Sequence, residues 1–263
     1  MNSEFINLSL AAYFLSGVLY FTNFMFKKKT ARIFASALFI LGFLLLTLAI
    51  IIRWLQAGRP PLANLYESLI FFAWSVALTY LVFEVIYKLR FLGAPISLLI
   101  IILLGFSSLL DDTIMPLIPA LQSNWLAIHV VSYFLAYGAV CISFILSLIY
   151  LAGSRKSYLE SSRLDYLDTL SYRLIAFSFP FLTIGLTTGA VWANVAWGSY
   201  WSWDPKETWS LITWLIYALY LHLRLMRGWN GRKIAYLNIA GFLAVLFTFF
   251  GVSFILPGLH SYL

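Results

Sequence analysis

Residues 33–52 read IFASALFILGFLLLTLAIII, twenty residues in a row without a charged side chain. A helix of this length is about 30 Å long, which matches the hydrocarbon core of a bilayer. A segment that crosses a membrane must satisfy its backbone hydrogen bonds without water, and a helix does so internally. The stretch therefore predicts a transmembrane helix.

Seven further apolar stretches of similar length surround it, at about 5–26, 65–87, 91–110, 126–152, 174–195, 207–226 and 235–256. The whole chain is 62% apolar and 10% charged, whereas soluble domains average about 45–50% and about 25%. We expect an all-α fold, a polytopic bundle of eight transmembrane helices that forms a single membrane domain over residues 1–263. The polar segment at about 153–173 is interpreted as a connecting loop.

The net charge of +7 comes from short clusters of Lys and Arg between the apolar stretches. This pattern reflects membrane topology and not a surface for nucleic acid. If the N-terminus is outside, 14 of the 17 basic residues lie on the inner side, and only Arg53, Arg59 and Lys206 lie outside. The positive-inside rule then predicts that both termini are on the outer side, in a periplasm or lumen.

Two features exclude other classes of protein. The single cysteine, Cys141, can form neither an intrachain disulfide nor a redox pair of thiols. The first apolar stretch is preceded by Glu4 and followed by a cluster of lysines at 27–29, which is the reverse of a cleavable signal peptide.

The region around 192–210 is rich in tryptophan: residues 192–214 read WANVAWGSYWSWDPKETWSLITW and hold six of the ten Trp residues. One interpretation is an aromatic belt at headgroup depth. The other is a flat, polarisable wall of Trp197, Trp201 and Trp203 on the outer face, suited to a large planar ligand. Asp204, Pro205 and Glu207 form a strong helix start, so both carboxylates have a capping role without any catalytic one.

The run WGSYWSWDPKE at 197–207 resembles the tryptophan-rich "WWD" signature of the haem-handling membrane proteins of cytochrome c maturation. With eight spans and the run PLANLYES at 61–68, nearly the whole chain resembles the CcsA family (ResC-like, labelled CcsB in some bacteria) of the system II cytochrome c synthase. The resemblance implies non-covalent b-type haem, a Ccs or ResB-type membrane subunit as partner, and haem presentation and export to apocytochrome c outside the membrane.

The run at 61–68 has two interpretations. Asn64 and Glu67 have the spacing of a capping box that opens the third span. Alternatively, Tyr66 or Glu67 contacts the haem-binding region.

The chain has three histidines, and the predicted topology places His129 and His260 on the outer side with the tryptophan loop. Ionisable groups in membranes are rare and usually functional, and two imidazoles can ligate one haem iron. The resemblance assigns axial ligation to the two histidines that flank the loop, which His129 and His260 match. We place Trp197, Trp201, Trp203 and Asp204 at the same haem site.

His222 lies 15 residues beyond Glu207, about 22 Å further along a helix and near the inner leaflet. It is either a structural histidine or a ligand of a second, inner haem. The resemblance implies the second role, with the other imidazole supplied by the partner subunit. Nearby Arg224 and Arg227 could meet haem propionates or could simply follow the positive-inside rule.

The predicted mechanism is that haem enters at His222, moves outward and is held by His129 and His260. The sequence shows no nucleophile or acid–base set for catalysis. The chain is interpreted as one component of a haem lyase complex, and whether it is itself an enzyme is left open. Alternatives are a system I-type haem-loading protein, a haem b electron-transfer subunit and a transporter with an aromatic cavity. The sequence does not distinguish a bacterial plasma membrane from a thylakoid membrane.

Overall fold

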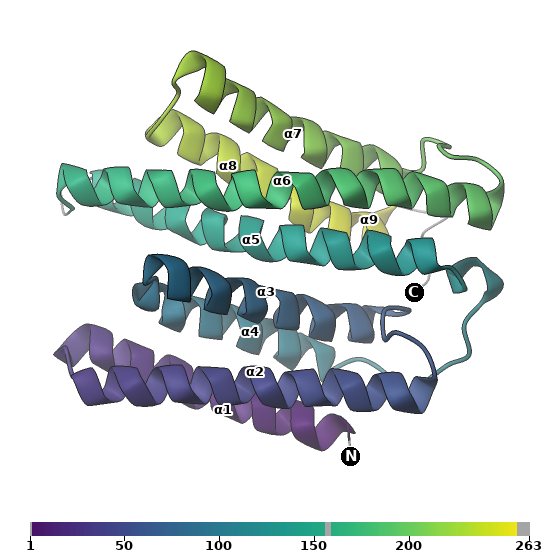
Figure 1. Cartoon of the computed structure of the whole chain (residues 1–263), viewed down its shortest axis with the longest axis horizontal. Helices are drawn as coiled ribbons and strands as arrows, with labels where there is room; N and C mark the ends of the chain where they lie inside the picture. The colour runs from purple at the N-terminus through teal and green to yellow at the C-terminus, as the bar shows by residue number, and fades with distance from the viewer. Residues whose placement is uncertain (1, 156–158, 257–263) are drawn as a thin grey trace. The chain divides into compact units, whose positions relative to one another are not determined.

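The structure is a computed structural model that describes residues 2–155 and 159–256 (Figure 1). Within these residues every regular element is helical, and eight helices are long and apolar enough to cross a membrane. The helices are α1 (Asn2–Phe26), α2 (Lys29–Ala57), α3 (Leu65–Tyr87), α4 (Gly93–Ser107), α5 (Asn124–Arg155), α6 (Ser161–Trp197), α7 (Pro205–Arg227) and α8 (Arg232–Leu246). The π-helical turn η3 (Phe247–Gly251) and α9 (Val252–Ile255) continue α8, and the short 3-10 helices η1 (Arg90–Leu92) and η2 (Pro119–Leu121) precede α4 and α5. The predicted all-α fold with eight spans is confirmed.

The chain divides into two compact units, Met1–Leu117 and Ile118–Leu263. In the first unit α1 packs on α2 and α4, and α3 packs on α2 and α4. Lipid gives helices no hydrophobic reason to associate, so small residues and hydroxyls hold them together. Ser9 donates to the carbonyl of Gly42 at 2.8 Å, and a Cβ on Gly42 would lie 3.2 Å from the Tyr13 ring. The α1–α2 pair is therefore close because the residues at its contact are small.

In the second unit α5 packs along α6 and α8, and α7 packs on α6 and α8. Its centre is stabilised by a buried polar cluster. Asn238 of α8 donates to the hydroxyls of Ser143 and Ser147 of α5, each at 2.8 Å, and Ser143 in turn donates to the Ser171 carbonyl of α6 at 3.1 Å. These bonds link three helices at a depth where water cannot compete.

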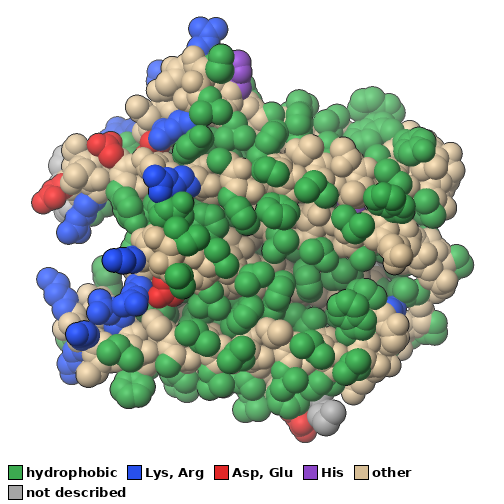
Figure 2. Space-filling model, in the orientation of Figure 1, with side chains coloured by type: hydrophobic (Ala, Val, Ile, Leu, Met, Phe, Trp, Pro, Cys, Tyr) green, Lys and Arg blue, Asp and Glu red, His purple; other side chains and the backbone are tan. Residues whose placement is uncertain are grey.

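The second unit has two chemically different ends. The start of α5, the end of α6, the loop at 198–204 and the start of α7 lie at one end, which we call the tryptophan end (Figure 1). The opposite end, the basic end, is where Lys and Arg gather in Figure 2. Its basic residues are Arg155, Arg163, Arg224, Arg227, Arg232 and Lys233. Lys206 is the one basic residue described at the tryptophan end.

The predicted loop at 153–173 is mostly wrong. Helix α5 continues to Arg155 and α6 begins at Ser161, so α6 has 37 residues. At about 1.5 Å per residue it is about 55 Å long and projects beyond a hydrocarbon core of about 30 Å. The first turns of α6 are helical because Leu167, Leu170 and Leu174 repeat at helical spacing and are buried.

Candidate functional site

His129 lies in the second turn of α5, at the tryptophan end. Its Nδ1 is 2.8 Å from the carbonyl oxygen of Gly185 in α6. A carbonyl can only accept, so Nδ1 carries the proton and the lone pair of the neutral ring is on Nε2. A backbone carbonyl holds metal-binding histidines in this way, by fixing the tautomer and the ring orientation. The geometry therefore suits ligation through Nε2.

Two glycines of α6 make room for this face of α5. A Cβ on Gly189 would lie 2.4 Å from His129 Nδ1, and a Cβ on Gly185 would lie 2.8 Å from the Tyr133 ring. Real Cβ atoms essentially never make contacts this short. Glycine at 189 therefore leaves room for the imidazole to reach the Gly185 carbonyl, and glycine at 185 leaves room for the Tyr133 ring.

Trp192 and Trp197, on the last turns of α6, extend the aromatic surroundings of His129. The centroid of Trp192 is 6.0 Å from that of His129 and 4.8 Å from that of Trp197. Trp192 is 2% exposed, and its Nε1–H donates to the carbonyl of Ala120 at 2.8 Å. Trp192 was not among the predicted site residues, although the sequence places it only five residues before Trp197 in the same tryptophan-rich region.

Trp201 and Trp203 form a second aromatic pair in the loop, edge to face with centroids 5.7 Å apart. Trp203 is 70% exposed and has a positive φ of 59°, a conformation that bulky residues rarely adopt. Ser199 donates to the Trp201 carbonyl at 3.0 Å. The three predicted tryptophans thus fall into two groups: Trp197 pairs with Trp192, which lies beside His129, while Trp201 and Trp203 pair with each other in the loop.

Helix α7 begins with the predicted capping box. Asp204 accepts from the Lys206 backbone N–H at 2.9 Å, and Glu207 accepts from the Asp204 N–H at 3.2 Å. Glu207 also accepts from the Ser202 N–H at 2.8 Å. The capping role of both carboxylates is confirmed, and it ties the tryptophan loop rigidly to the start of α7.

His222 lies on the exposed side of α7, towards the basic end. It shares a stripe at helical spacing with Leu215, Leu219 and Met226, which are 50%, 47% and 71% exposed. The opposite stripe of α7 is buried and contains Thr213, Tyr217 and Tyr220. Within the described residues His222 makes no hydrogen bond, so the structure gives it no internal structural partner.

Arg224 is occupied by contacts inside the unit. Its guanidinium bonds Asp168 of α6 at 2.5 Å and the Trp229 carbonyl at 3.2 Å. Asp168 also accepts from the Gly231 N–H at 3.1 Å. This part-buried pair joins α6, α7 and the turn before α8. It makes Arg224 a structural residue, whereas Arg227 is exposed.

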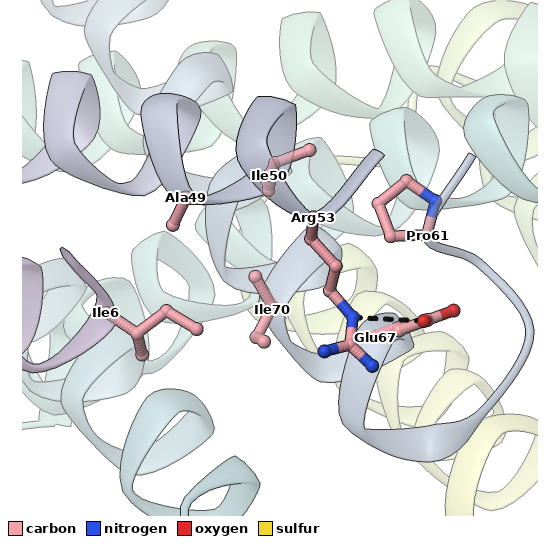
Figure 3. A pocket seen from close by; sticks show the side chains of 7 residues that line it. All are labelled: Ile6, Ala49, Ile50, Arg53, Pro61, Glu67 and Ile70. Carbon is pink, nitrogen blue, oxygen red and sulfur yellow. Dashed lines mark hydrogen bonds and ion pairs between the residues drawn. The ribbon is translucent and has the colours of Figure 1, made fainter. Parts of the chain in front are cut away.

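Glu67 of the first unit is the centre of a buried ionic cluster, of which Figure 3 shows the bond to Arg53. Its carboxylate bonds Arg53 at 3.0 Å and Arg59 at 2.9 Å, and its side chain is fully buried. Arg53 and Arg59 also donate to the carbonyls of Asp112 and Met115. The cluster therefore joins the last turns of α2, the loop before α3 and the loop that follows α4.

The predicted capping box at 61–68 is half right. Asn64 accepts from the Glu67 N–H at 2.9 Å, as expected of an N-cap. The Glu67 carboxylate, however, accepts from the N–H of Ala63 at 2.8 Å and not from that of Asn64. The Glu67 carboxylate does not reach the Asn64 N–H because it is held by ion pairs with Arg53 and Arg59. Tyr66 lies under the Arg53 guanidinium, 4.8 Å from ring centroid to Cζ.

The remaining predicted ligand, His260, lies outside the described residues. Chain connectivity places it four residues after Leu256, the residue that follows α9 at the tryptophan end.

Comparison with known proteins decides the family. Residues 62–260 match the family model described as cytochrome C assembly protein. The chain belongs to the CcsA family of cytochrome c biogenesis proteins. It is 39% identical to CcsA of Guillardia theta over 97% of this chain and 94% of that one, and 43% identical to CcsA of Prochlorococcus marinus (strain MIT 9301) over 90% and 87%. CcsA of Chlamydomonas reinhardtii is 48% identical over 83% of this chain, which spans 65% of that longer protein.

A solved structure extends the likeness in fold. The cytochrome c haem lyase CcmF matches 95% of this chain and 46% of its own, with a TM-score of 0.67 and 21% identity. This chain and the matched part of CcmF therefore share a fold.

Proposed function

We propose that this CcsA family member holds haem at the tryptophan end of its second unit and presents it to apocytochrome c, as one subunit of a system II cytochrome c synthase. The observation that carries the proposal is the bond from His129 Nδ1 to the Gly185 carbonyl at 2.8 Å. It fixes the ring so that Nε2 is the ligating atom. His260 would supply the second imidazole to the iron.

The chain contributes position and shielding. His129 and His260 hold the iron, while Trp197, Trp201 and Trp203 cover the macrocycle and exclude water. Asp204 holds the loop at the start of α7 through its cap. The bound haem supplies the vinyl groups to which the client's cysteine thiols add.

The tryptophan wall can be tested directly. Replacing Trp197, Trp201 and Trp203 together by Ala should weaken haem binding by the purified protein roughly a hundredfold, because three aromatic contacts worth about 1 kcal/mol each are lost. Trp54→Ala, at a half-exposed position in α2, is the matched control and should change nothing. Unchanged haem in the triple variant would support the aromatic-belt interpretation.

The orientation rests on the separation of charge in the second unit, where the tryptophan end carries Lys206 and the basic end six described Lys and Arg residues. We therefore place the tryptophan end outside, in the periplasm or lumen. A topology reporter fused after Arg163 should report a cytoplasmic position. The same reporter fused at Ser199 should report a position outside the membrane. A reversed result at either position would rule out the outer haem site.

A second haem contact is proposed at His222. Placing the polar His222 ring in lipid, among leucine and methionine side chains, costs free energy. A binding partner from outside this chain would remove that cost. We infer that the Ccs or ResB-type subunit covers this stripe and supplies the other imidazole. Haem would enter there and move to the outer pair.

A further inference from the structure

Three residues of α6 form a stripe that faces α5. Gly185, Gly189 and Trp192 are four and three residues apart, so they lie on one side of the helix. The two glycines have the G-x-x-x-G spacing that lets transmembrane helices approach each other closely. Here the space that they leave is filled by two rings of α5: His129 lies against Gly189, and Tyr133 lies against Gly185.

The His129 ring is held by one hydrogen bond and two aromatic contacts. Its Nδ1 bonds the Gly185 carbonyl, as described above. The Tyr133 ring stands edge to face against the imidazole, with centroids 5.0 Å apart and an interplanar angle of 75°. The Trp192 ring lies 6.0 Å away and is tilted by 30°. A single hydrogen bond allows a ring to pivot about it, whereas the aromatic contacts restrict that rotation.

Tyr133 is itself fixed in place. It lies one helical turn after His129 on the same face of α5 and is 7% exposed. A Cβ on Gly185 would be 2.8 Å from its ring, and the Tyr137 ring lies 5.4 Å from it. The phenol ring therefore has little room to move and forms a firm wall for the imidazole.

We propose that Tyr133 is a positioning residue that keeps the His129 imidazole in one orientation and one tautomer, with the lone pair on Nε2. Gly185 serves both rings, because its carbonyl accepts from His129 and its missing side chain makes room for Tyr133. The link to haem rests on the proposed function, in which Nε2 binds the iron. Tyr133 acts on His129 and does not itself bind the iron.

The first measurement uses the full chain without haem. Nitrogen NMR of the chain labelled at histidine distinguishes a protonated ring nitrogen from an unprotonated one, and His129→Gly identifies the His129 signals. In the wild type we expect a single tautomer, with the proton on Nδ1. Tyr133→Leu should give a mixture of two tautomers, because the ring that supports the imidazole is lost. Gly185→Ala should do the same, because its Cβ displaces the Tyr133 ring.

Two control variants separate positioning from a general loosening of the fold. Tyr133→Phe keeps the ring and removes only the hydroxyl, which lies near Ser210 of α7, so it should preserve the single tautomer. Tyr217 is also buried in the second unit but lies against Gly241 of α8, so Tyr217→Leu should leave the His129 signals unchanged. A single tautomer in Tyr133→Leu or Gly185→Ala, or a mixture in Tyr217→Leu as well, would overturn the inference.

Haem binding tests the link to the proposed function separately. If His129 Nε2 binds the iron, the haem affinity of Tyr133→Leu in the complex should fall about 10–100-fold, as when other supports of a metal-bound histidine are lost. Tyr133→Phe should keep the wild-type affinity. Mixed tautomers with unchanged haem affinity would support the positioning role of Tyr133 but contradict ligation by His129. The two failures are therefore distinguishable.

Discussion

Replacing His129 with Gly in the complex should reduce cytochrome c attachment to background, and millimolar imidazole should restore part of it. Glycine lacks the imidazole ring, so the variant loses Nε2. The missing ring leaves a space next to the proposed iron site that added imidazole can fill. His260→Gly should behave in the same way, because we propose that each histidine supplies one of the two axial ligands. The measurement is attachment of haem to a reporter cytochrome, with and without imidazole.

The position of His129 can be perturbed without removing it. Gly189→Ala would place a Cβ 2.4 Å from Nδ1, so the imidazole must leave the Gly185 carbonyl. Loss of such a supporting bond costs about 10–100-fold in metal affinity. Gly105→Ala in α4 is the matched control, since an added Cβ there meets nothing within 4 Å. Normal spectra and full attachment in both His129→Gly and His260→Gly would exclude these side chains as ligands.

Replacing His222 with Ala should lower the haem content of the complex to that of this chain expressed alone. Expressed alone, the chain should hold haem weakly, and the partner should raise its content. His222→Ala should cancel that gain and also empty the outer site, because haem would no longer be received at the basic end. The measurement is haem per complex, with and without the partner.

Leu219→Ala is a useful control for this prediction. Leu219 lies on the same exposed stripe, one turn from His222. The change should weaken any helix contact slightly and leave the haem content unchanged. Full haem loading in His222→Ala with the partner present would contradict the ligand role and favour a structural role for His222.

The eight spans could be predicted because a bilayer demands length and apolarity, which are local properties of sequence. The start of α6 was missed because Arg163 and Asp168 suggested a loop. The buried leucines at 167, 170 and 174 carried a helical signal. The π-helical turn had no such signal, since it follows from packing against α7.

The sequence could nominate residues for the candidate site but could not predict their contacts. Sequence identified His129, yet not the Gly185 carbonyl 56 positions away or the space that Gly189 provides. It identified Glu67 as a capping residue, yet Arg53 and Arg59 redirect the carboxylate. These partners are distant in the chain, so only the fold brings them together.

The most direct test of the haem proposal is the optical spectrum of the purified, reduced complex, with haem quantified per protein. Non-covalent b-type haem with a low-spin spectrum, shifted by His129→Gly and returned by imidazole, is the predicted result. A complex that purifies intact without haem, or with a spectrum unaffected by His129→Gly, would contradict it.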